Sequence, residues 1–132
     1  MTNQFDIEKT YAHWIETSEK DYNTMIHLYE SSDYSWSLFI GHIVLERLLK
    51  ASVVKENKDH APFTHDLTKL ASLTKIEFTT EQLDWLDTIT TFNLNARYDS
   101  YKQAFNKKCT SEFTKVWVDN IKNLRLWIKE RQ

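Results

Sequence analysis

The spacing of apolar residues predicts a chain built from helices. Between about residue 6 and residue 30, they recur at steps of three and four positions, the spacing that gathers side chains on one face of an α-helix. Asp6 stands in front of this stripe and is a candidate N-cap. The stripe, with one serine in it, comprises Tyr11, Trp14, Ile15, Ser18, Tyr22, Met25, Ile26 and Tyr29.

A second helix is predicted from about residue 33 to about residue 58, and its pattern is different. Apolar residues cover most of its circumference, which is typical of a helix that packs against several neighbours. We therefore expect this helix to be the central one. The residues that produce this pattern are Trp36, Leu38, Phe39, Ile40, Ile43, Val44, Leu45, Leu48, Leu49, Val53 and Val54.

Three further helices follow along the chain. Thr64 can cap a short one over residues 64–73, and Thr79 and Gln82 have the spacing of a capping box before a longer one. Thr110 or Ser111 can cap the last. The inward face of the fourth helix is predicted to hold Leu83, Leu86, Ile89, Asn93 and Ala96, and that of the last helix Phe113, Val116, Trp117, Ile121, Leu124 and Ile128.

Composition agrees with this helical pattern. The chain has 132 residues with one glycine, Gly41, and one proline, Pro62, and this scarcity favours long uninterrupted helices. The connections are short, except for residues 97–109, and short connections join antiparallel neighbours. We therefore expect an all-α fold, an antiparallel up-and-down four-helix bundle with one short additional helix, in a single domain over residues 1–132.

Charge and cysteine usage narrow the class of protein. The net charge of −2 gives no overall attraction to nucleic acid. No apolar run approaches the roughly 20 residues of a membrane-spanning helix, and the amino-terminal residues do not resemble an export signal. Cys109 has no second cysteine to pair with. We therefore expect a cytoplasmic protein that does not interact with membranes, with no cofactor and no bound metal.

Polar residues occupy one line of the predicted central helix. His42, Glu46 and Lys50 follow one another at four-residue steps, so they share a side of the helix. They form either an exposed or interface strip, or a polar seam inside a groove. On the fourth helix Asn93 and Arg97 continue the line of the inward residues, which predicts that Arg97 points toward the bundle and pairs with Glu46. The alternative is an ordinary salt bridge at a helix end.

The segment around Arg97 is basic and aromatic. Tyr98, Tyr101 and Lys102 follow Arg97 closely, and two more lysines precede residue 109. Cations with aromatic rings can bind phosphate and stack on bases, although a solvated or dimer-facing loop has the same composition. His60 and His65 suggest metal ligands, but their spacing across Pro62 does not suit a metal, so we expect no metal site.

Four stretches together resemble the HEPN domain family, named for nucleotide binding in higher eukaryotes and prokaryotes. They are SEKDY, YSWSLFIGHIVLERLLKAS, PFTHDLTKL and ARYD, and their order and spacing span nearly the whole chain. The residues that carry the resemblance are Glu46, Leu49, Lys50, Ala51, Pro62, His65, Asp66, Leu67, Arg97 and Tyr98.

The resemblance implies a four-helix bundle that forms a homodimer and pairs with a minimal nucleotidyltransferase, often as toxin and antitoxin. Ribonuclease members of the family carry an Arg and a His separated by four to six residues. Here Lys102, Gln103 and Ala104 stand where a His would follow Arg97, and no histidine occurs after His65. Because RNA cleavage generally uses a group that exchanges protons near neutral pH, we predict no catalytic residue.

The leading hypothesis is a non-catalytic module that binds a nucleotide, RNA or a nucleotidyltransferase. Arg97 would contact phosphate, Tyr98 or Tyr101 would stack on a base, and Lys102 would add charge. Glu46 and Asn93, within the polar seam, would hold Arg97 in place. The alternative is a ribonuclease toxin with a variant active site that lacks the Arg-His motif. A third possibility is a purely structural partner of a nucleotidyltransferase.

Overall fold

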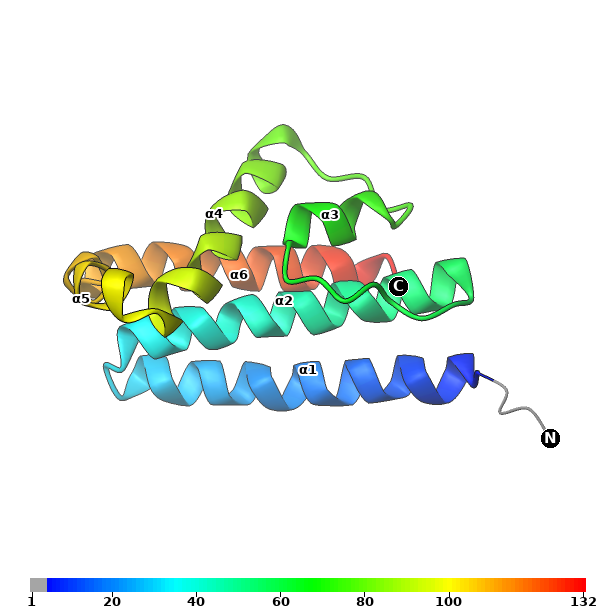
Figure 1. Cartoon of the computed structure of the whole chain (residues 1–132), viewed down its shortest axis with the longest axis horizontal. Helices are drawn as coiled ribbons and strands as arrows, with labels where there is room; N and C mark the ends of the chain where they lie inside the picture. Colours follow the sequence, from blue (N-terminus) through cyan, green and yellow to red (C-terminus); the bar gives the residue numbers. More distant parts are fainter. Residues whose placement is uncertain (1–4) are drawn as a thin grey trace.

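The computed structural model describes residues 5–132, and all of the regular structure in that range is α-helical. The all-α prediction is therefore confirmed. Six helices follow one another along the chain (Figure 1). Their bounds are α1 Ile7–Glu30, α2 Tyr34–Asn57, α3 Leu67–Ser72, α4 Thr80–Arg97, α5 Asp99–Lys108 and α6 Ser111–Glu130.

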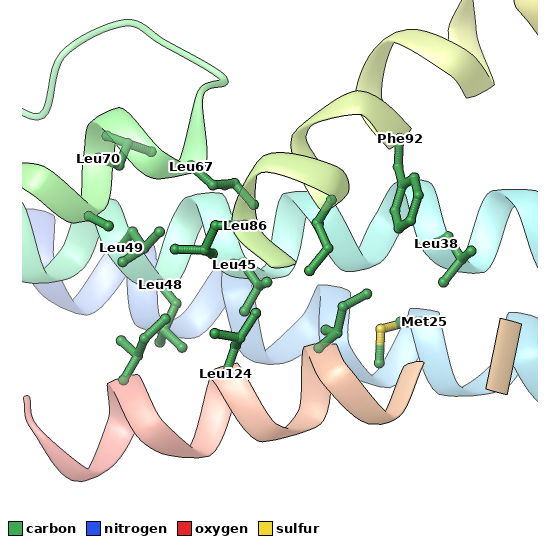
Figure 2. Packing of buried hydrophobic residues seen from close by; sticks show 14 of the residues in the cluster. Met25, Leu38, Leu45, Leu48, Leu49, Leu67, Leu70, Leu86, Phe92 and Leu124 are labelled. Carbon is green, nitrogen blue, oxygen red and sulfur yellow. The ribbon is translucent and has the colours of Figure 1, made fainter. Parts of the chain in front are cut away.

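Helix α2 is the central element, as its apolar pattern predicted. It packs against each of the other five helices, and α1, α2 and α6 lie side by side in Figure 1. Figure 2 shows how the core forms around it: leucines of α2 meet side chains from α1, α3, α4 and α6. The labelled members are Met25, Leu38, Leu45, Leu48, Leu49, Leu67, Leu70, Leu86, Phe92 and Leu124.

The glycine of α2 marks the closest approach of its neighbours. A Cβ atom at Gly41 would lie 2.5 Å from Cδ1 of Ile121 on α6 and 3.1 Å from the sulfur of Met25 on α1. Interiors are packed too tightly to accept such contacts without movement of the neighbouring side chains. The position is therefore occupied by the one residue that lets α1 and α6 both approach α2 there.

Local capping explains where most helices begin. The carboxylate of Asp6 accepts a hydrogen bond from the backbone N–H of Lys9, and Thr79 and Gln82 form the predicted capping box. Thr110, not Ser111, caps α6. The predicted N-cap of α3, Thr64, is wrong by two residues, because Asp66 caps this helix. The Asp66 carboxylate accepts hydrogen bonds from two backbone N–H groups of the first turn, and its negative charge suits the positive end of the helix dipole.

Several details differ from the predicted pattern. The long link over residues 97–109 contains helix α5, so the structure has two short additional helices and not one. Leu83 and Val116, predicted to point inward, are exposed, and Val118 is buried in place of Val116. Helix α4 is inclined to α1, α2 and α6 (Figure 1), so the regular four-helix bundle stays a prediction.

None of the helices in the described range combines the length and apolarity needed to cross a bilayer.

Candidate functional site

Two tyrosines and two cations gather where α4 meets α5. Helix α4 ends at Arg97, Tyr98 is extended, and α5 begins at Asp99. Arg97 is exposed, and Tyr98 and Tyr101 are 52% and 48% exposed. The four predicted ligand-binding residues thus follow one another at this junction, with Arg97, Tyr98 and Tyr101 exposed and Lys102 half-buried. We call Arg97, Tyr98, Tyr101 and Lys102 the junction patch.

The start of α2 supports this patch. The ammonium group of Lys102 lies 5.4 Å from the centre of the Trp36 ring, a cation–π distance. Trp36 is itself partly exposed and contacts Phe39 edge to face. The contact joins α5 to α2, so Lys102 is held against the body of the protein and not free in solvent.

The predicted pairing of Arg97 with Glu46 is wrong. The Arg97 side chain is exposed, and its Nη1 donates to Oδ1 of Asn93 at 3.3 Å, one turn earlier on the same helix. Arg97 is the last residue of α4, where the inward line reaches the edge of the protein. There the guanidinium stays hydrated, which avoids the cost of burying a cation.

Glu46 instead belongs to a buried cluster that includes a residue from the next loop. Its Oε1 accepts from Nδ1 of His65 at 2.7 Å, and its Oε2 accepts from Nζ of Lys50 at 3.2 Å. Nε2 of His42 lies 3.9 Å from Oε1. His42, Glu46 and Lys50 are buried, whereas half of the His65 side chain is exposed. These four residues are the buried cluster.

The hydrogen bond to a backbone oxygen defines which nitrogen of the His42 ring carries the hydrogen. Nε2 of His42 lies 2.8 Å from the backbone oxygen of His65. Because a carbonyl oxygen only accepts, Nε2 carries the hydrogen. Nδ1 of His42 is buried and has no partner within the described residues. Burial, which disfavours the charged ring, lowers the pKa of His42 below its ordinary value.

The lowered pKa predicts a loss of stability in mild acid. The unfolded chain takes up a proton at His42 near pH 6.5 while the folded chain does not. Stability is therefore retained above that pH and falls as the pH drops through it, by at most about 1.4 kcal/mol per pH unit. Urea unfolding at about pH 7 and about pH 5 should show a smaller loss in His42→Gln than in the parent. The exposed His13→Gln is the control, and an equal loss in both variants would contradict the prediction.

A comparison with protein-family models complements this geometry. The model described as "HEPN domain" matches residues 11–131. The chain belongs to the HEPN domain family. The resemblance seen in the sequence is thereby confirmed over nearly the whole chain.

A solved structure agrees in fold. The crystal structure of TT1696 from Thermus thermophilus is similar, with a TM-score of 0.78 and 13% sequence identity. The similarity covers 92% of this HEPN domain and 98% of that chain. A search of curated proteins gives no match. At this identity, the structural similarity supports the fold alone.

Sequence reasoning missed the role of His65 in this HEPN domain. The four-residue spacing correctly placed His42, Glu46 and Lys50 on one line of the helix, but it did not indicate that a residue of the following loop bonds to Glu46. A signal was present, since the link after α2 must return toward α3. From Lys58 back to Glu46 is about 18 Å along a helix, and seven extended residues span about 23 Å. His65 was therefore within reach of Glu46.

Within the described residues, neither a metal site nor a reactive cysteine is supported. Over residues 5–132, no three His, Cys, Asp or Glu side chains converge as a metal site would require. Cys109 is buried, and burial raises the pKa of its thiol to about 11. A thiol with so high a pKa is a poor nucleophile at neutral pH. The junction patch and the buried cluster are thus the two places with notable chemistry.

Proposed function

We propose that this HEPN domain is a non-catalytic module that recognises a nucleotide, or a nucleotidyltransferase that carries one, through the junction patch. The observation that supports the proposal is that Tyr98 and Tyr101, each about half exposed, stand within a few residues of the cations Arg97 and Lys102 at the junction of α4 and α5. Family membership supports the same interpretation.

The side chains of the patch suit the parts of a nucleotide. A guanidinium presents N–H groups in a fork that matches phosphate oxygens. Arg97 has one weak partner, Asn93, which a phosphate could replace or supplement. Stacking of a base on an exposed aromatic ring contributes roughly 1–3 kcal/mol. A ligand here would not have to break a buried ion pair, because Arg97 is already at the surface.

The absence of a histidine near Arg97 supports binding without chemistry. Lys102, Gln103 and Ala104 occupy the positions at which ribonuclease relatives carry the His. A lysine would need a strongly lowered pKa to exchange protons at neutral pH. The same proposal includes one cytoplasmic domain over residues 1–132, a regular up-and-down bundle, a homodimer, and a nucleotidyltransferase partner in a toxin-antitoxin-like pair.

Calorimetry tests the proposal directly. The protein is titrated with AMP, ATP and a short RNA, and Arg97→Ala should weaken the observed affinity about tenfold or more. Lys20→Ala, which removes an exposed cation from α1, is the matched control and should bind like the parent. Binding that is unchanged in Arg97→Ala would rule out the junction patch.

Two further measurements separate the rivals. Cleavage of labelled RNA that is lost in Arg97→Ala would replace the binding proposal with the variant ribonuclease. Co-purification with a nucleotidyltransferase in the absence of any nucleotide affinity would replace it with the purely structural partner. Binding of a nucleotide without cleavage supports the proposal as stated.

A further inference from the structure

A surface cavity lies where the turn between α1 and α2 meets helix α5 (Figure 1). Its volume is about 330 Å³, which is within the range of small-molecule sites. Two segments that are far apart in the sequence form its wall. The start of α2 contributes Asp33, Tyr34 and Trp36, and α5 contributes Asn106. A carboxylate, an amide and two aromatic rings therefore surround one space.

The cavity adjoins the junction patch through Lys102. Lys102 and Asn106 are four residues apart on α5, so they lie on the same side of that helix. This side faces the start of α2, because the Lys102 ammonium is 5.4 Å from the centre of the Trp36 ring. Trp36 also lines the cavity. An anionic group on a ligand in the cavity would thus have a cation beside it.

The polar groups of the cavity are available to a ligand. Asp33 precedes α2 as its N-cap residue, yet its side chain makes no capping hydrogen bond. Over residues 5–132 its carboxylate forms no ion pair, and the exposed amide of Asn106 has no hydrogen-bond partner. The cavity therefore offers two carboxylate oxygens that accept, and an amide that can both donate and accept.

Guanine is the base whose edge fits these groups. It presents two neighbouring donors, N1–H and the 2-amino group, which match the two oxygens of a carboxylate, and the acceptor O6 follows on the same edge. Adenine, cytosine and uracil each present one donor group with an acceptor beside it. A carboxylate that faced any of these three bases would meet an acceptor, which is unfavourable.

We propose that this cavity, the base cavity, binds the guanine ring of a nucleotide. The Asp33 carboxylate accepts from N1–H and from the 2-amino group, and the Asn106 amide donates to O6. Tyr34 and Trp36 line the space that the ring occupies, and the phosphate extends toward Lys102. The inference rests on the proposed function, because Lys102 belongs to the junction patch, and it adds the identity of the base.

Calorimetric titration with GMP and AMP tests the base cavity. GMP should bind about tenfold more tightly, since a bidentate contact to a base discriminates by about this factor. IMP, which lacks the 2-amino group, should bind more weakly than GMP. Asp33→Asn should weaken GMP binding about tenfold and strengthen XMP binding, because an amide accepts from N1–H of xanthine and donates to its 2-oxo group. Asparagine is as good an N-cap as aspartate, so the fold is retained.

Asp84→Asn is the matched control. It removes the same charge from an exposed position near the start of α4, about 20 Å along that helix from Arg97, and should leave the preference for GMP unchanged. Equal affinity for GMP and AMP, or an Asp33→Asn variant with the preference of the parent, would overturn the base cavity. Weaker binding by Arg97→Ala in the same titrations would then leave the proposed function standing. Absence of binding by all four nucleotides would overturn both.

Discussion

Replacing Glu46 by alanine should lower the free energy of unfolding by about 3–5 kcal/mol. The substitution removes the single carboxylate that accepts from both Lys50 and His65. The Lys50 ammonium is buried, so it would be left without its counterion in a poorly hydrated place. Urea denaturation followed by circular dichroism measures the change.

A second substitution separates the lost charge pair from lost packing. Glu46→Leu with Lys50→Met removes both charges and keeps apolar volume, and replacing a buried ion pair in this way is often neutral or stabilising. The double variant should therefore be more stable than Glu46→Leu alone. Asp119→Ala breaks the exposed pair of Lys115 and Asp119 and should leave the unfolding midpoint unchanged.

The stability of Glu46→Ala also tests whether the buried cluster is a seam inside the protein or a strip exposed to water. If Glu46→Ala were as stable as the parent, the Lys50 ammonium would have to reach water, and the cluster would be a solvated strip along α2. That was the alternative that the four-residue spacing of His42, Glu46 and Lys50 left open. The burial of all three residues favours the seam instead.

The helices were predictable because their signals are local. The stripe of α1, the apolar circumference of α2 and the capping box at Thr79 all depend on residues within a few positions of each other. The same is true of the line from His42 to Lys50. The position of His65 was not predictable in this way, because it depends on the path of a loop that has no periodic pattern.

Arg97 shows why orientation at a helix end is hard to predict. The four-residue spacing correctly predicted that Arg97 and Asn93 lie on the same side of α4, and the two side chains form a hydrogen bond. Whether the Arg97 side chain is buried depends on which neighbouring helices extend beside the last turn of α4. Sequence spacing gives the direction of a side chain around the helix axis, but not the extent of the neighbouring helices.

Helix α4 provides a related case. The predicted stripe passed from Ile89 to Asn93 by a four-residue step, whereas the buried residue is Phe92, three positions on. Both steps fit a period of 3.6. Asn93 is half-buried and Phe92 is fully buried, because burial of the aromatic ring gains more than burial of the amide.

Phe92 gives the second prediction of a large effect. Its ring is 5.4 Å from that of Phe105 on α5 and 5.6 Å from that of Trp117 on α6, centre to centre. It therefore joins three helices, and only 2% of it is exposed. Phe92→Ala should lower the free energy of unfolding by about 3–5 kcal/mol, through lost burial and the cavity left behind.

Phe63→Ala is the matched control for Phe92→Ala, because it removes the same atoms from a ring that is in water. It should change the free energy of unfolding by less than about 0.5 kcal/mol.

Hydrogen exchange tests whether the loss of stability in Phe92→Ala is concentrated in α5. Phe105 is the one residue of α5 that is buried, so losing its contact with Phe92 should reduce the protection of α5 amides more than that of α1 amides. Equal loss of protection in α1 and α5 would mean that α5 is held by other contacts, and that the junction patch does not depend on this aromatic core for its position.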